Sequence, residues 1–365
     1  MGDPAFLVSQ SGELTNGLQA IISTQGYDPT TIVIDGTEDS VHYLSSAAID
    51  RIEQHVSDTT NSYLIVIDGT MHPGQFVDLQ LRLPLATLRD RRGVLWEWLG
   101  RENPVAATQF DLQQCRITQR KAATEQRDDA TSGPSGTSGE LAAAEQQAQQ
   151  LRNTLESRQA VARQRIQGSY TDVDSQIVLV GKMDAPTTAV WAGLTDQTAS
   201  PIPGRPAQPT TAITACGPHT LAVTDTPGIP DSDDLPEWFT ETVPGMIAAV
   251  ERATCVLGVG DCQSLLSVLD DQYGVTCRIL TSTDTTTARE TLQNVLETAE
   301  YVIRLPYSDT AHTFVSKLHE QTTVHAIEYD DAIYVHTEVA LSAADWLRRR
   351  TLAVDGDIQA DPTGI

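Results

Sequence analysis

The sequence predicts an α/β protein, and two observations carry that prediction. Short apolar runs alternate with helical patterns at the beginning, in the middle and near the end of the chain, which is typical of strands and helices packed in layers. A Gly- and Ser-rich stretch, residues 131–139, lies between two long helical patterns. We therefore expect a small N-terminal α/β domain (residues 1–98) with a helical hairpin arm (99–170), a central α/β domain (175–300) and a small C-terminal α/β appendage (301–350).

The first domain should begin with three strands, over residues 5–9, 31–35 and 63–68, and with a helix over Ser46–Val56. Residues 95–127 have the pattern of one continuous helix. A second helix over residues 140–167 is rich in Ala, Gln, Glu and Arg, and its large apolar residues are too sparse for a core helix. The arm is therefore expected to be a solvated helical hairpin, with the Gly-rich stretch as a flexible connection.

From residue 176 onwards the alternation of strands and helices resumes. Strands are expected over residues 177–180, 212–216, 220–224, 254–259, 275–281, 301–305, 324–329 and 332–339. Helices are expected from Thr187 and over residues 238–251, 264–272, 288–298 and 311–321. Only about twenty residues separate Asp284 from the appendage, so the end of the central domain should be shortened.

The charge balance indicates a protein suited to high salt. The 365 residues carry a net charge of −25, and only Lys121, Lys182 and Lys317 are lysines among 24 basic residues. An acidic, Lys-poor surface keeps its solubility where salt screens charge, as in the cytosol of a halophile; a basic partner is the alternative explanation. The charge argues against DNA and against general nucleic-acid binding at low salt. In molar salt the Debye length is about 3 Å, so local Arg–RNA contacts remain feasible.

Cysteine and hydropathy patterns place the chain in a reducing compartment. The five Cys show no C-x-x-C pair, which favours reduced thiols over disulfides or zinc, and the scattered His suggest no metal site. No apolar run approaches the roughly 18 residues of a membrane span, and no basic, apolar signal segment opens the chain. We expect a cytoplasmic protein without membrane contact.

The stretch from Gln176 to Trp191 has the layout of a phosphate-binding loop. An apolar strand leads into Gly181, and a helical segment begins near Thr187. A functional loop reads G-x-x-x-x-G-K-[ST], but here Pro186 replaces the second Gly, Thr187 replaces the Lys, and only Thr188 keeps its hydroxyl. Pro186 removes a backbone N–H and Thr187 removes a cation, so nucleotide binding should be weakened by orders of magnitude. Lys182 lies inside the loop and could approach a phosphate, or be an ordinary surface Lys.

Two later motifs follow in the order that a nucleotide-binding domain of this kind requires. Asp225-Thr-Pro-Gly228 follows an apolar strand, where a D-x-x-G motif would hold Mg²⁺ through its Asp and a phosphate through its Gly N–H. Thr211 precedes the same hairpin, either as a further Mg²⁺ ligand or as part of a polar loop. Asp284 occupies the place of the base-recognition Asp of N-K-x-D, whose Asn and Lys are Thr281 and Ser282 here.

These motifs, with others along the chain, resemble the HflX family of ribosome-associated GTPases. Residues 68–75 (Asp-Gly-Thr-Met-His-Pro-Gly-Gln) are similar to that family's D-x-x-L-T-P-x-Q segment, and residues 89–92 (Arg-Asp-Arg-Arg) to its D-R element. The likeness extends to Leu112-Gln113, the Gly-rich residues 133–139, the D-L-P run at residues 234–236 and the C-terminal residues 306–347.

The resemblance implies a Ras-like P-loop G domain that binds GTP and Mg²⁺ and works on the large ribosomal subunit. The nucleotide-binding residues would be Gly181, Lys182, Pro186, Thr187, Thr188, Asp225, Gly228 and Asp284, with Mg²⁺ held by Thr188, Thr211 and Asp225. The best candidates for contacts with ribosomal RNA are Arg89, Arg91 and Arg92, which could equally be a solvated face. Because the motifs are degenerate, two hypotheses stay open: a GTP-binding protein with slow or lost hydrolysis, or a nucleotide-independent pseudo-GTPase that binds ribosomes or a protein.

Overall fold

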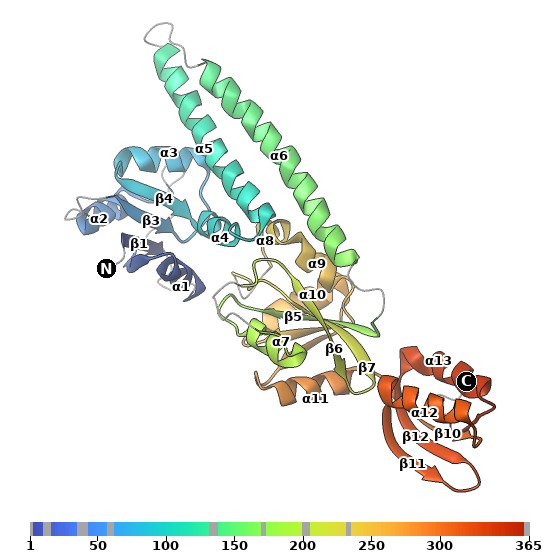
Figure 1. The fold of residues 1–365 in the computed structure, drawn as a ribbon. Helices are drawn as coiled ribbons and strands as arrows, with labels where there is room; N and C mark the ends of the chain where they lie inside the picture. Colours follow the sequence, from blue (N-terminus) through green and yellow to red (C-terminus); the bar gives the residue numbers. More distant parts are fainter. Residues whose placement is uncertain are drawn as a thin grey trace.

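The computed structural model describes most of the chain and contains three β-sheets (Figure 1). The described residues are 3–9, 16–34, 43–56, 62–130, 138–168, 173–198, 205–230 and 235–360. Each sheet belongs to one of three α/β units along the chain, and a long helical arm projects from the junction of the first two (Figure 1).

The N-terminal sheet is parallel and has the strand order β2-β1-β3-β4. Its strands are β1 (Asp3–Ser9), β2 (Tyr27–Val33), β3 (Tyr63–Ile67) and β4 (Ala86–Asp90), and its helices are α1 (Asn16–Thr24), α2 (Ser46–Val56), α3 (Pro73–Arg82) and α4 (Arg91–Leu99). Every residue of β3 is buried, as expected of a parallel strand covered on both faces. The sequence patterns missed α3 and β4, although Pro73 at the first helical position and the bond from His72 N–H to Gln75 Oε1 (2.8 Å) are a helix-start signature.

The arm consists of α5 (Pro104–Ala130) and α6 (Ser138–Gln167), which pack along each other. The prediction of one helix over residues 95–127 is wrong, because the chain breaks between α4 and α5. Asn103 causes the break: its Oδ1 accepts the backbone N–H groups of Val105 (2.9 Å) and Ala106 (3.3 Å), which caps α5 just before Pro104. Residues 131–137 of the Gly-rich stretch lie outside the described residues.

The central sheet has the order β6-β7-β5-β8-β9. Its strands are β5 (Ser175–Gly181), β6 (Thr210–Cys216), β7 (His219–Asp225), β8 (Cys255–Val259) and β9 (Cys277–Leu280), and only the β6–β7 hairpin is antiparallel. The hairpin turns at Gly217, whose φ of 57° is easily adopted only without a side chain. This is the strand–loop–helix, hairpin, strand arrangement of a P-loop GTPase fold up to its fifth strand.

Helices cover both faces of the central sheet. On one face lie α7 (Thr187–Thr195) and α11 (Thr285–Val295), and on the other lie α9 (Pro244–Val250) and α10 (Gln263–Tyr273), with α8 (Glu237–Thr242) next to α9. The prediction of one helix over residues 238–251 is wrong, because Pro244 cannot continue α8 and begins α9 instead.

The C-terminal sheet is antiparallel, with the order β11-β12-β10-β13. Its elements are β10 (Thr298–Leu305), α12 (Asp309–Gln321), β11 (Thr323–Tyr329), β12 (Ile333–Ala340), a short 3₁₀ turn (Leu341–Ala343), α13 (Ala344–Ala353) and β13 (Asp357–Ala360). The chain passes from α11 directly into this sheet, so in the described part of the chain the central sheet ends at β9.

The N-terminal and central units share one hydrophobic core and do not meet at a hydrated polar interface. Buried side chains of α1 and α4 belong to the same cluster as those of β5, α9 and α10. Trp96 Nε1 donates to Thr242 Oγ1 (2.8 Å), and the Trp96 ring meets Trp238 edge-on, with centroids 6.1 Å apart. This docking fixes α1 beside the phosphate-loop segment described next.

Candidate functional site

The phosphate-loop segment joins the end of β5 to the start of α7 and folds tightly over Gly181. A Cβ atom on Gly181 would lie 2.7 Å from Ala185 Cβ, 2.9 Å from Thr187 Cγ2 and 2.9 Å from the Val259 carbonyl oxygen. These distances are shorter than carbon contacts allow, so only glycine fits. Two side chains of the loop and the backbone of β8 thus pack directly against Gly181 at the end of β5.

Two backbone N–H groups of the loop are already bonded within the chain. Met183 N–H donates to the Ile229 carbonyl (3.0 Å), and Ala185 N–H donates to the Lys182 carbonyl (2.9 Å). Ile229 N–H returns a bond to the Gly181 carbonyl (2.9 Å), so the residue after Gly228 pairs with the loop as a short parallel bridge. A phosphate cradle needs such N–H groups free and convergent. Here they close the loop onto the D-x-x-G segment.

Met183 fills the space between the loop and two other segments, the D-x-x-G segment and α1. It is buried, with 7 % of its surface exposed. A Cβ on Gly228 would lie 2.5 Å from Met183 Cα, and a Cβ on Gly17 of α1 would lie 2.9 Å from Met183 Cβ. The loop is therefore held in direct contact with the D-x-x-G segment and with α1 of the N-terminal domain.

Asp225 ends β7 beneath this loop and is the most unusual titratable group near it. It is 1 % exposed, and neither carboxyl oxygen has a well-formed hydrogen bond with any described residue. Burial raises the pKa of Asp225 to about 7, although the nearby Thr188 and Thr187 hydroxyls and the Thr226 backbone oppose the shift. The carboxyl group is thus poised between its neutral and charged forms near neutral pH.

The hydroxyl groups expected to share a Mg²⁺ ion with Asp225 have other hydrogen bonds. Thr188 Oγ1 donates to the Arg205 carbonyl (3.0 Å), and Thr211 Oγ1 lies 2.9 Å from Thr224 Oγ1. Within the described residues no group of three or more His, Cys, Asp or Glu is arranged to hold a metal ion. One carboxylate and two engaged hydroxyls do not form a Mg²⁺ site without a nucleotide that brings its own oxygens.

The remaining candidate nucleotide contacts also have structural roles. Lys182 Nζ lies 3.2 Å from Asp261 Oδ2, across the loop that follows β8. Asp284 caps α11, because its Oδ2 accepts the backbone N–H groups of Thr286 and Thr287. Pro186 precedes α7 without a side-chain cap, and Thr187 is buried with 2 % exposure.

The three arginines proposed for RNA contact lie at the end of β4 and the start of α4. Arg89 Nε donates to Glu97 (2.9 Å) with its guanidinium stacked on Phe110, and Arg91 Nε donates to Asp68 (2.6 Å). Arg92 lies over the Trp96 ring and approaches Asp90 at 3.5 Å. Carboxylates of the same chain therefore offset much of this positive charge.

Taken together, these residues do not fit GTP and Mg²⁺ in the arrangement seen here. Ala185 packs against Gly181 and Met183 against Gly228, two loop N–H groups are bonded, and the one cation of the loop is paired. The sequence showed the loss of the Gly and the Lys, but it did not single out Met183 or Gly17. A large apolar residue inside a phosphate loop was the available signal for Met183.

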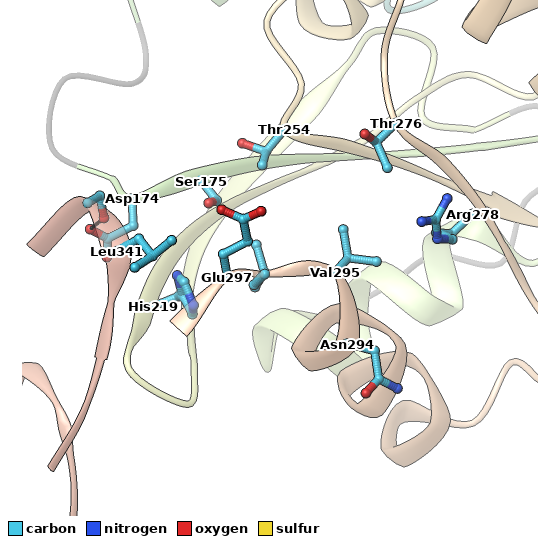
Figure 2. Close-up of a pocket in the computed structure, with 12 residues that line it drawn as sticks. Asp174, Ser175, His219, Thr254, Thr276, Arg278, Asn294, Val295, Glu297 and Leu341 are labelled. Carbon is cyan, nitrogen blue, oxygen red and sulfur yellow. Dashed lines mark hydrogen bonds between the residues drawn. The ribbon is translucent and has the colours of Figure 1, made fainter. Parts of the chain in front are cut away.

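A separate polar hollow of about 440 Å³ lies at the opposite end of the central sheet (Figure 2). Ser175 and His219 come from the first residues of β5 and β7, whereas phosphate sites of parallel sheets lie at the carboxyl ends. Both ring nitrogens of the buried His219 lack partners among the described residues. Burial lowers the pKa of His219, against the opposing charges of Asp174 and Glu338. Ser342 of the C-terminal unit donates to Asp174 (2.9 Å), so this hollow marks the junction of the last two units.

No protein-family model and no curated protein matches the chain. Among solved structures, it is similar to the SsGBP–GDP complex at 16 % identity, with a TM-score of 0.43 over 76 % of this chain and 82 % of that one. A GTP-binding protein from the archaeon Sulfolobus solfataricus in complex with GDP gives 15 % identity and 0.39, over 76 % and 81 % of the two chains. Aquifex aeolicus Era bound to GDP.AlF4− gives 16 % and 0.24, over 29 % and 39 %. Because these TM-scores are below 0.5, the fold is assigned from the chain's own strand order. No described helix is long and apolar enough to cross a membrane.

Proposed function

We propose that this chain is a nucleotide-independent pseudo-GTPase that binds the large ribosomal subunit. The closed loop is the observation that supports nucleotide independence. Met183 lies against Gly17 and Gly228, and its backbone N–H donates to the Ile229 carbonyl. To admit a triphosphate, the loop would have to break these contacts and separate from α1. The motif resemblance along the chain supports the ribosomal partner, and the two-helix arm offers it an extended surface.

The nucleotide half is tested by titrating the protein with a fluorescent GDP or GTP analogue in molar KCl, with and without Mg²⁺. We expect no saturable binding at micromolar nucleotide, because several charge-assisted contacts worth ~1.5–3 kcal/mol each are missing. Lys182→Ala should change nothing, and neither should the matched control Lys317→Ala on α12. Micromolar binding that disappears in Lys182→Ala but persists in Lys317→Ala would refute the proposal.

The ribosomal half is tested by co-sedimentation with large subunits from the organism that makes the protein. The bound fraction should be the same without nucleotide, with GDP and with GTP. Binding that requires GTP would instead support the GTP-binding hypothesis, and absence from the subunit pellet under all three conditions would remove the ribosome from the proposal.

The other hypothesis, a GTP-binding protein with slow or lost hydrolysis, is favoured by one observation. The two carboxyl oxygens of Asp225 are buried without a well-formed hydrogen bond, which suits a state in which a cation reaches them. In that case Mg²⁺ with GTP should raise the melting temperature at pH 8, whereas the closed loop predicts no change.

A further inference from the structure

A cavity of about 190 Å³ lies where the N-terminal domain, the arm and α8 meet. Met71 and Phe76 form its wall on the N-terminal domain, and Leu112 and Leu155 close it from the arm. The indoles of Trp96 and Trp238, in edge-on contact, form a third side. Polar side chains contribute about as much of the lining as these apolar and aromatic ones.

Two arginines line this cavity with incomplete hydrogen bonding. Arg92 Nε is buried without a partner among the described residues, and its Nη2 has only long contacts, to the Met71 carbonyl (3.4 Å) and to Asp90 (3.5 Å). Arg116 lies one turn after Leu112 on the same face of α5, and it forms no ion pair with a described residue. Arg152, three residues before Leu155 on α6, is exposed, donates to Gln149 Oε1 (3.2 Å) and is not part of the lining.

The positive charges of the three arginines repel one another. Burial lowers the pKa of Arg116, and the neighbouring charges of Arg152 and Arg92 lower it further. Asp90 is fully buried and already accepts bonds from Met71 N–H, Gly93 N–H and Gln113 Nε2, so it offsets only part of this charge. Glu241 is the other carboxylate of the lining and lies on an exposed residue of α8.

Two arginines with a single ion pair between them, from Arg92 to Asp90, are unexpected beside one cavity in a chain with 49 acidic residues and only 24 basic ones. Leaving guanidinium groups together costs free energy unless an anion neutralises them. Guanidinium forks match phosphate and carboxylate oxygens, and the aromatic walls match a flat apolar group. Gln113 Oε1, buried without a partner, would accept a hydrogen bond from the same ligand.

We infer that this cavity binds a small phosphate monoester that carries an aromatic or apolar group, with Arg92 and Arg116 beside its phosphate and the two indoles beside its apolar part. A dianion is preferred over a carboxylate because two guanidinium groups line the cavity and their one described ion pair is from Arg92 to Asp90. The site is separate from the phosphate loop, since no residue of that loop lines the cavity. A ligand there would touch all three of the elements that meet at the cavity.

The test is a titration of the full-length protein with phenyl phosphate in 0.5 M KCl, followed by tryptophan fluorescence and by the shift in melting temperature. Benzoate, inorganic phosphate and phenol test the charge and the ring separately. Phenyl phosphate should saturate the signal and raise the melting temperature, inorganic phosphate and benzoate should bind more weakly, and phenol should have no effect. Arg116→Gln should weaken the binding of phenyl phosphate at least about tenfold, the loss of one charge-assisted hydrogen bond.

Arg127→Gln is the matched control, since it removes the same charge from an exposed position of α5 about 16 Å further along the helix. It should bind phenyl phosphate like the unmodified protein. Without ligand, Arg116→Gln should melt no lower than the parent, because it relieves repulsion; this also shows that the variant folds. Equal weakening by Arg116→Gln and Arg127→Gln, equal affinity for phenol and phenyl phosphate, or no saturation by phenyl phosphate would overturn the inference.

Discussion

Asp225 connects the phosphate-loop segment to the stability of the protein. Its carboxyl group is buried at the end of β7, and burial raises its pKa from 3.8 to about 7. Between these two values the folded protein keeps a proton that the unfolded chain has released. The free energy of unfolding should therefore fall as the pH rises from about 4 to about 7 and level off above it.

Asp225→Asn should remove this part of the pH dependence. The variant has no charge to bury, so it should be more stable than the parent above pH 7, by an amount on the order of 4 kcal/mol, and about equally stable near pH 4. Urea unfolding at pH 4, 6 and 8 measures the difference. Asp284→Asn is the control, because the exposed Asp284 caps α11 and its Asn substitute still caps a helix. A parent and an Asp225→Asn variant with parallel stability curves would contradict the assignment.

The sequence shows which phosphate-binding residues the loop lacks, but it does not show how the loop packs against the rest of the protein. Pro186 and Thr187 could be recognised because they occupy fixed places in a motif whose residues have known roles. Met183 could not, because its partners Gly17 and Gly228 are far away in the sequence. A residue that blocks a site can be recognised only from the residues that pack against it in the folded protein.

At the scale of elements, Asn103 joins the arm to the central domain. The side chain is 2 % exposed; Oδ1 caps α5, and Nδ2 donates to the carbonyls of Ala207 (2.9 Å) and Thr242 (3.2 Å). Ala207 lies in the segment that leads to β6, and Thr242 ends α8. One amide thus fixes the start of α5 against two parts of the central unit.

Asn103→Ala should lower the free energy of unfolding by about 2–4 kcal/mol, because it removes a helix cap and leaves two buried carbonyls with one fewer donor. Denaturant unfolding measures the loss, and limited proteolysis should show earlier cleavage between α4 and α5. The matched control is Asn153→Ala in the exposed middle of α6, which should change the free energy by no more than about 0.5 kcal/mol. Equal effects of the two substitutions would contradict the role of Asn103.

Local patterns located most strands and helices, and failed where a helix is interrupted. The helix over Ser46–Val56 matches α2, and the strand over residues 63–68 matches β3 to one residue. The continuous composition of residues 95–127 predicts one helix, but an Asn-Pro step divides it. Likewise, residues 238–251 predict one helix, which a Val-Pro step divides. The boundaries of the three units stay predictions, and the structure describes the three sheets around which they are drawn.

At the scale of the whole molecule, charge repulsion should make stability depend on salt. With a net charge of −25, raising KCl from 0.1 to 1 M shortens the Debye length from about 10 to about 3 Å and should raise the melting temperature markedly. Screening predicts that most of the gain occurs below about 1 M. If the melting temperature instead rises linearly up to 3 M KCl, the cause is exclusion of salt from the protein surface. An unchanged melting temperature would contradict both explanations.

The sequence by itself determined the α/β class, the order of the motifs and the residues that the phosphate loop lacks, because these depend on local periodicity and on residue type at fixed spacing. The tertiary structure decided that the loop is closed, since this follows from α1 and the segment after Asp225 packing against Met183. It also placed Arg92 and Arg116 at one cavity beside two indoles, although they come from different helices. Contacts between segments distant in the chain are set by how whole elements pack, and no local pattern records them.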